Sequence, residues 1–190
     1  APCVRAVLSF QLPQRHSELW AIFKTLSNRH DREAFQRFLA PEDVRQNFYD
    51  ALSAYARTLR VALGAVQFYN TVSEEQIATY KRDLVFFHNL RIAVRQRYAE
   101  VVDYKDYEAK VRQLLDKHIQ SAEVVAVVEQ VNIFDREAFA VQVAQFESAA
   151  GQADTIVNHL QRAITEVLDR DPAFYHKFSR LIRDAIAAYR

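Results

Sequence analysis

Residues 73–102, SEEQIATYKRDLVFFHNLRIAVRQRYAEVV, carry the pattern that decides the fold. Their apolar side chains recur at steps of three and four positions, which is the spacing of one face of an α-helix. The main stripe contains Ile77, Tyr80, Leu84, Phe87, Val94, Tyr98 and Val101, and a second stripe beside it contains Phe86, Leu90 and Ala93. A helix with so wide an apolar face must be covered by other helices.

The start of this helix is marked by Ser73 and by Gln76 three positions later. This spacing is that of a capping box, in which a serine hydroxyl accepts hydrogen bonds from free backbone amides. Glu74 and Glu75 place negative charge at the positive end of the helix dipole. A helix of about 29 residues would be roughly 43 Å long, so we expect a bundle arranged along it.

A second long helix is predicted from Pro41 to Tyr69. Its apolar residues step regularly along one face and are Val44, Phe48, Leu52, Tyr55, Leu59, Leu63 and Val66. Only residues 70–72 separate it from the first helix, and so short a connection predicts an antiparallel hairpin. The expected scaffold is therefore a hairpin of helices at about 41–69 and 73–102.

The composition favours an all-α fold. The 190 residues are 50% hydrophobic, which is enough for a sizeable core, but they include only two glycines and four prolines. That leaves little material for the tight turns of a sheet-rich protein. We expect a single helical domain over residues 1–190, with shorter helices packed on the hairpin.

The shorter helices are predicted from their start signals. Pro13 opens one, Asp31 caps another that ends at Pro41, and the segment from Asp106 to Ile119 forms a third. Further helices are expected from Asp135 to a left-handed cap near Gly151, from Asp154 onward, and from Asp171 onward. Residues 124–131 are rich in β-branched side chains and fit either helix or strand, of which we choose helix.

Charge, cysteine content and hydropathy indicate the setting of the protein. The formal net charge is +1, so no strong nonspecific attraction to nucleic acid or to a membrane is expected. The single cysteine, Cys3, cannot form an internal disulfide, which suits a reducing compartment. No apolar run approaches the length of about 20 residues that spans a membrane. We expect a soluble, cytoplasmic protein with no membrane partner.

Motifs for catalysis are missing from the sequence. The two glycines, Gly64 and Gly151, are too far apart to form a phosphate-binding loop. The six histidines are scattered, with no His-Glu-x-x-His motif and no cysteine pair. Paired acids such as Glu74 and Glu75 are explained by capping. We therefore expect no catalytic, cofactor-binding or metal-binding residue in this chain.

The strongest charged feature lies within the first long helix. The window from Ile77 to Arg97 contains one acidic residue, Asp83, and five basic residues, which are Lys81, Arg82, Arg91, Arg95 and Arg97. Lys81, Arg82 and Arg91 are candidate phosphate contacts, although a solvated face that complements the helix dipole explains the same pattern. Arg91 falls where the stripe expects an apolar residue, so it either reaches solvent from the edge or pairs with an acid of another helix.

Aromatic residues gather near the end of this helix. Tyr98, Tyr104 and Tyr107 lie close in sequence to Arg95 and Arg97. Tyrosine and arginine are enriched at the energetic centres of protein interfaces, because each combines apolar area with a polar end. These residues form a candidate partner interface. The alternative is that the tyrosines cover the seam between the hairpin and the following helix.

Four strings resemble the carboxy-terminal region of the restriction (R) subunit of type I restriction-modification enzymes. They are YKRDL from Tyr80, RYAE from Arg97 with VDYKDYE from Val102, VNIFDREAF from Val131, and DPAFYHKFS from Asp171. The resemblance extends from about Trp20 to the end of the chain. None of the strings is a catalytic signature, so the argument depends on their occurring together.

The resemblance implies a place within a larger enzyme. In that family the R subunit has a nuclease domain, two motor domains that use ATP and magnesium to translocate DNA, and a helical carboxy-terminal domain. This chain resembles the helical domain, which is thought to help hold the subunit on a core of methyltransferase and specificity subunits. The expected partners are those subunits and the motor domains of the same chain, with weak DNA binding as the alternative. No nuclease or phosphate-loop residue has a matching position here.

Overall fold

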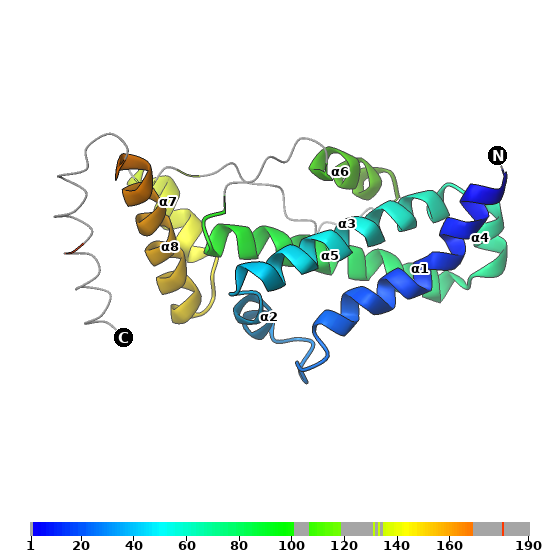
Figure 1. Cartoon of the computed structure of the whole chain (residues 1–190), viewed down its shortest axis with the longest axis horizontal. Helices are drawn as coiled ribbons and strands as arrows, with labels where there is room; N and C mark the ends of the chain where they lie inside the picture. Colours follow the sequence, from blue (N-terminus) through cyan, green and yellow to red (C-terminus); the bar gives the residue numbers. More distant parts are fainter. Residues whose placement is uncertain are drawn as a thin grey trace. The chain divides into compact units, whose positions relative to one another are not determined.

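The computed structural model describes residues 2–100, 107–118, 131, 133, 135–168 and 180. Within those residues the chain forms eight α-helices and no strand, which confirms the all-α prediction (Figure 1). The helices are α1 (Pro2–Ile22), α2 (Arg32–Phe38), α3 (Glu42–Leu63), α4 (Val66–Thr71), α5 (Glu74–Arg97), α6 (Tyr107–His118), α7 (Arg136–Ala144) and α8 (Ala149–Leu168).

Residue contacts divide the chain into two compact units. Unit 1 comprises Ala1–Ala93 and Val102–Ala126, and unit 2 comprises Val94–Val101 and Val127–Arg190. The division falls within α5, whose last turn belongs to unit 2. The single domain over residues 1–190 stays a prediction, and each of the two units is described by itself.

Three predicted helix starts are confirmed by their caps. The Asp31 carboxylate accepts a hydrogen bond from the amide of Ala34, and the Asp135 carboxylate accepts one from the amide of Ala138. The Ser73 hydroxyl accepts one from the amide of Gln76, as a capping box requires. Start signals are local in sequence, which is why they can be predicted without knowledge of the tertiary fold.

The central helices α3 and α5 form the predicted antiparallel pair. Tyr55 in α3 donates its hydroxyl to the carbonyl oxygen of Tyr80 in α5, at 2.8 Å. Phe48, nearer the start of α3, packs against Phe87, further along α5. The two helices therefore run in opposite directions. Burial raises the pKa of Tyr55, so its phenol keeps the proton that it donates.

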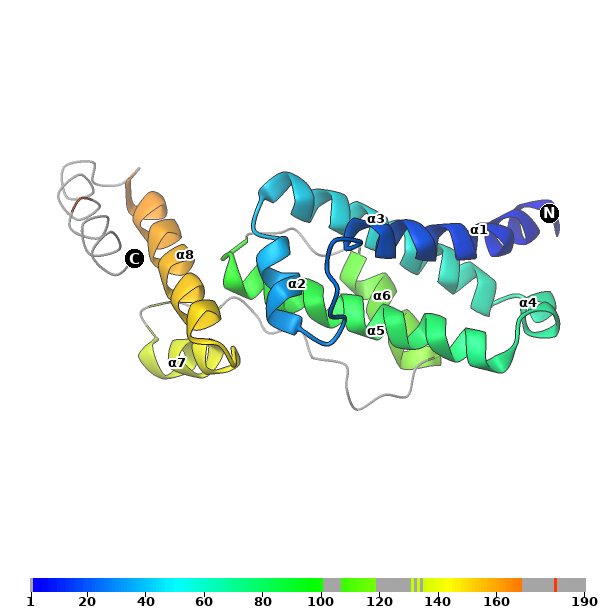
Figure 2. The ribbon, with the colours of Figure 1, turned by 90° about the horizontal axis from the view of Figure 1, so that it is seen from below.

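Helix α1 packs along this pair. The ring of His16 lies 5.5 Å from that of Tyr55, and Phe23 lies 5.5 Å from Phe48, so α1 runs antiparallel to α3. His16 also contacts Tyr80, and Phe23 also contacts Phe87, so α1 runs parallel to α5. Figure 2 shows these three helices side by side.

The prediction that Pro13 opens a helix is wrong, because α1 is continuous from Pro2 to Ile22. Proline inside a helix removes one backbone hydrogen bond. Leu12 and Leu19, on either side of Pro13, are fully buried. Packing of these side chains compensates for the missing bond and allows the helix to continue.

An aromatic cluster forms the core where α1, α2, α3 and α5 meet. Ring contacts connect Trp20, Phe23, Phe35, Phe38, Phe48, Phe86 and Phe87. Edge-to-face and offset arrangements of this kind are favourable beyond the burial of apolar area. Arg45, also buried, donates to the carbonyl oxygens of Leu39 and Ala40 and so satisfies the end of α2.

The predicted helix from 41 to 69 is broken at Gly64. Helix α3 ends at Leu63, and Ala65, with φ −111° and ψ 122°, is extended before α4 begins. Val66, assigned to the buried stripe, is 74% exposed. Glycine lowers helix stability and is common just after a helix end, and this signal outweighs a stripe that continues for one more turn.

Helix α5 also ends earlier than the predicted Val102. The amide of Glu100 donates to the carbonyl of Arg95, and the amide of Ala99 to that of Gln96. These two bonds form a Schellman motif, in which the turn residue takes the left-handed conformation. Ala99 has φ +50°, which is uncommon for a residue other than glycine.

The expected left-handed cap at Gly151 is wrong. Helix α7 ends at Ala144, and Gly151 lies within α8, which begins at Ala149. Ser148 provides the start of α8, because its hydroxyl accepts a hydrogen bond from the amide of Gly151. Asp154, predicted to begin the next helix, lies in the second turn of α8 and makes a tertiary contact described below.

The remaining predicted elements are described in part. Helix α6 confirms the helix predicted from Asp106 to Ile119, and its buried face consists of Val111, Leu114 and Leu115. The helix predicted over residues 124–131 falls outside the described residues except for Val131, which is not helical. The helix predicted to begin at Asp171 starts outside the described residues.

Candidate functional site

The most elaborate polar site of the described residues lies in unit 2, where α8 meets the last turn of α5. Arg97 is fully buried, and its Nε and Nη2 atoms donate to Asp154 Oδ2 at 3.1 and 2.6 Å. The Asp154 side chain remains 47% exposed. A half-exposed carboxylate thus neutralises a buried guanidinium, which is costly to bury without a hydrogen-bonded partner.

Three more side chains of α8 bond the end of α5. Asn158 donates to the carbonyl of Arg97 at 2.9 Å, His159 to that of Gln96 at 2.8 Å, and Arg162 to that of Ala99 at 3.0 Å. The last carbonyls of a helix have no partner within the helix. Here α8 supplies those partners, so the end of α5 is fixed by a row of side chains from another helix.

His159 acts in this row as a neutral donor. Burial lowers the pKa of the imidazole, the bond to the Gln96 carbonyl raises it, and the nearby Arg162 charge lowers it. The ring also packs 5.4 Å from Phe139 of α7. The arrangement orders the end of α5.

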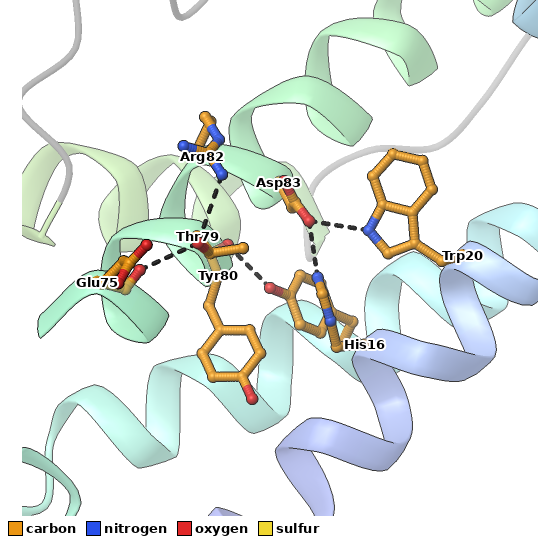
Figure 3. Close-up of polar contacts among 8 residues, drawn as sticks. His16, Trp20, Glu75, Thr79, Tyr80, Arg82 and Asp83 are labelled. Carbon is orange, nitrogen blue, oxygen red and sulfur yellow. Dashed lines mark hydrogen bonds and ion pairs between the residues drawn. The ribbon is translucent and has the colours of Figure 1, made fainter. Parts of the chain in front are cut away.

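A second polar site, in unit 1, joins α1 to α5 (Figure 3). Asp83 Oδ2 accepts hydrogen bonds from Trp20 Nε1 at 2.8 Å and from His16 Nε2 at 2.7 Å. A histidine and an aspartate at this distance resemble part of a catalytic triad. The nearby hydroxyl of Thr79 donates to the carbonyl of Glu75. Because the Thr79 hydroxyl is already donated within α5, we interpret the bonds to Asp83 as structural contacts that hold α1 against α5.

The residues of the predicted partner interface are placed differently from one another. Arg97 is buried, whereas Arg95 and Tyr98 are half-buried. The guanidinium of Arg97 lies 5.9 Å from the centre of the Tyr98 ring. Tyr104 and the side chain of Tyr107 fall outside the description. Arg97 therefore contributes to packing inside unit 2, and the interface assignment of the set stays a prediction.

The candidate phosphate contacts are also divided by burial. Lys81 is half-buried and Arg82 is exposed, but Arg91 is buried with its guanidinium 4.7 Å from the centre of the Tyr49 ring. Arg91 thus lies over the face of an aromatic ring. His88, one turn earlier, is also buried, and burial and the Arg91 charge lower its pKa to about 4.

The sequence pattern did not identify several residues that the structure brings together. Asp154, Asn158 and Arg162 recur every four positions and so share one face of α8, which is the local signal that was available. At the end of α6, burial lowers the pKa of His118, and the charges of Lys117 and of Lys81 in α5 lower it further. Neither partnership is encoded in local spacing.

In the described part of the chain, no group of three or more histidine, cysteine or acidic side chains could hold a metal ion. None of the helices described is long and apolar enough to cross a membrane.

Comparison with known proteins identifies the family. No curated protein and no solved structure matches the chain. Residues 31–190 match the family described as "Type I restriction enzyme HindI endonuclease subunit-like, C-terminal". The match covers most of the chain, including every helix from α2 to α8. The chain therefore belongs to the family of carboxy-terminal regions of type I restriction enzyme HindI endonuclease subunit-like proteins.

Proposed function

We propose that this chain is an assembly domain that helps dock a type I restriction endonuclease subunit on its methyltransferase and specificity subunits. The observation that carries the proposal is the family match over residues 31–190. In a type I enzyme, cleavage and modification belong to different subunits, so the endonuclease subunit needs a surface for the modification core. A helical region at its carboxy-terminal end is suited to that task.

Unit 2 offers apolar side chains for such a surface. Val141 of α7 is 65% exposed and Ile156 of α8 is 39% exposed. Tyr98, half-buried beside Arg97, belongs to the same unit. Large exposed apolar side chains and tyrosines are typical of the residues that dominate binding energy at interfaces. We assign the docking contact to unit 2, with Tyr98, Val141 and Ile156 as its candidate contact residues.

The assignment predicts a loss of assembly without a loss of folding. A full-length endonuclease subunit carrying Val141→Ser and Ile156→Ser should bind the modification core more weakly by about 2 kcal/mol, the scale of an interface hot spot. Because both side chains are exposed, the melting temperature should stay near that of the unaltered subunit. Titration calorimetry with the purified core measures the affinity.

A matched control is Val66→Ser with Tyr69→Ser in α4, since these residues of unit 1 are also exposed. That variant should assemble normally. Full-strength binding by the Val141 and Ile156 variant would contradict the proposed surface. Arg97 is unsuitable as a probe because it is buried, and its substitution would disturb unit 2.

We further infer that catalysis belongs to other parts of the subunit. ATP and magnesium, expected for the parent enzyme by resemblance, have no matching phosphate loop in this sequence, and no acidic cluster of the described residues fits the metal. The purified chain should neither hydrolyse ATP nor cut DNA. Phosphate release above a blank, or DNA cleavage, that persists after repurification would show that this inference is wrong.

A further inference from the structure

Two large apolar side chains are exposed on α4, the short helix that follows α3. Val66 is 74% exposed and Tyr69 is 48% exposed, and residues three positions apart lie on the same side of a helix. Phe68, between them in sequence, is buried and holds the inner side of α4 on unit 1. We call the outer side, with Val66 and Tyr69, the α4 face. Neighbouring exposed apolar groups of this kind mark interaction sites, whereas single ones are ordinary.

Tyr69 is held in one orientation before any partner binds. Its hydroxyl donates to the carbonyl oxygen of Leu63 at 3.1 Å, and its ring lies edge-on to that of Phe68 with 5.9 Å between the centroids. Ordering a free side chain at an interface reduces the net free energy of binding, and this cost is smaller for a side chain that is already fixed. Tyrosine is also enriched among the residues that dominate binding energy. Tyr69 therefore has the properties of an interface anchor.

Charge around the α4 face favours a protein over a nucleic acid. Residues 61–80 contain no lysine, arginine or histidine, and their only charged residues, Glu74 and Glu75, are exposed at the start of α5. A phosphate backbone would be repelled by this charge. The exposed polar residues next to the two apolar side chains in sequence are Gln67, Asn70, Thr71 and Ser73. An apolar centre with a polar rim is the arrangement of a protein interface.

The beginning of α1 lies at the same end of unit 1 as α4. Helix α1 runs antiparallel to α3, as the contacts of His16 with Tyr55 and of Phe23 with Phe48 show. Its first turns therefore lie toward the end of α3, where α4 follows. Figures 1 and 2 show this arrangement from two directions. A chain segment that leads into α1 thus reaches unit 1 near the α4 face.

The family match indicates which partner meets this face. The matched family consists of carboxy-terminal regions of endonuclease subunit-like proteins, so the other domains of such a subunit lie amino-terminal to this region and connect to it through α1. Two domains tethered in one chain have a high effective concentration, so a contact centred on two side chains is sufficient to hold them together. Interfaces between domains of one chain are typically smaller and more polar than those of permanent complexes.

A second copy of this chain is a poorer partner for the α4 face. In a two-fold contact the same surface of both copies meets, so Glu74 and Glu75 would face the same glutamates of the other copy. Like charges placed opposite one another at an interface oppose association. A second copy also lacks the tether that raises the effective concentration.

We propose that the α4 face is the contact of unit 1 with the domain of the endonuclease subunit that precedes this region in the same chain. Tyr69 is the anchor of the contact, and Val66 extends its apolar area. The proposal rests on the family membership of the chain. It is independent of the docking contact assigned to unit 2, because that contact involves different helices and joins different subunits.

Photo-crosslinking in the full-length endonuclease subunit tests the proposal. The photoreactive aromatic residue p-benzoylphenylalanine replaces Tyr69, and irradiation should join position 69 to residues of the same chain that precede this region, which mass spectrometry identifies. The matched control carries the same residue at Arg57, an exposed position of α3 in unit 1, and should give about tenfold less of this product. A product with twice the subunit mass, a product that contains a modification subunit, or a yield equal to that of the control would overturn the proposal.

Hydrogen exchange in the full-length subunit gives a second measurement. The variant Val66→Ser, Tyr69→Ser should raise the exchange rate of the residues found by crosslinking by about tenfold, because their cover is lost. Its α3 and α5 amides should keep their protection, since both substituted side chains are exposed. The matched control is Val141→Ser with Ile156→Ser in unit 2, which should leave those residues unchanged whatever its effect on binding to the modification core. Equal changes in the two variants, or no change in either, would overturn the proposal.

Discussion

Replacing Leu59 or Leu84 by alanine should lower the free energy of unfolding by about 2 to 5 kcal/mol. Both side chains are fully buried, so the cost combines lost transfer energy with the cavity that remains. Leu59 lies one turn beyond Tyr55 in α3, and Leu84 one turn beyond Tyr80 in α5. Because these helices are antiparallel, the two leucines lie on opposite sides of the hydrogen bond between Tyr55 and Tyr80.

The measurement can use the one tryptophan of the chain. Trp20 lies in unit 1, packed against Phe86 and Phe87 of α5, so its fluorescence reports unfolding of the same helices. Val66→Ala is the matched control, because it also shortens an apolar side chain in unit 1 but at an exposed position. Its effect should stay within about 0.5 kcal/mol. Unchanged denaturation midpoints for both leucine variants would contradict the pairing of α3 with α5.

The sequence predicted those parts of the fold that depend on short-range signals. Asp31, Ser73 and Asp135 each cap a helix because a side-chain oxygen reaches an amide only three residues away. The stripes of α3 and α5 were predictable for the same reason, since a buried face repeats every three or four residues.

Errors arose where two local signals disagreed. At Gly64 the regular stripe predicts that the helix continues, whereas the helix ends at Leu63. At Gly151 the glycine predicts a helix end, whereas Ser148 starts a helix that includes it. At Pro13, burial of Leu12 and Leu19 outweighs the lost hydrogen bond. At Gly64 and Gly151 one local signal outweighs another, whereas at Pro13 the outcome depends on tertiary packing, which local patterns do not contain.

The polar sites could not be predicted, because their partners are distant in sequence. Asp154 was assigned to a helix start, which is the ordinary role of an aspartate before an apolar stripe. In the structure it bonds Arg97, 57 positions earlier. Arg97 in turn was assigned to a partner interface because arginine is frequent there. Only the folded chain shows that its guanidinium is inside unit 2.

Substitution of the buried Arg97 is the second change that should strongly lower stability. Arg97→Ala should lower the stability of unit 2 by about 3 to 5 kcal/mol, the range for breaking a buried ion pair. The substitution removes the bonds to Asp154 and also the buried stem of the side chain. Asp154→Ala should cost a similar amount, because it leaves the fully buried guanidinium of Arg97 without the carboxylate that neutralises it.

The geometry of the ion pair between Arg97 and Asp154 should distinguish arginine from lysine at position 97. Arg97 uses its Nε and Nη2 atoms together on one carboxylate oxygen. Lysine carries the same charge but cannot present two donors in this way. Arg97→Lys should therefore lose most of the stability that Arg97→Ala loses. In the double variant Arg97→Ala, Asp154→Ala the total should be smaller than the sum of the single effects, since the second change removes an interaction already lost.

Hydrogen exchange of the α8 amides measures these effects where they occur, together with circular dichroism for the whole chain. Glu166→Ala is the matched control, because it removes another α8 carboxylate bonded to an arginine, Arg162, but on the exposed surface. Exposed pairs one turn apart contribute only about 0.3 to 0.5 kcal/mol. If Asp154→Ala changed protection of α8 no more than Glu166→Ala does, the bond to Arg97 would not be what fixes α8 on the end of α5.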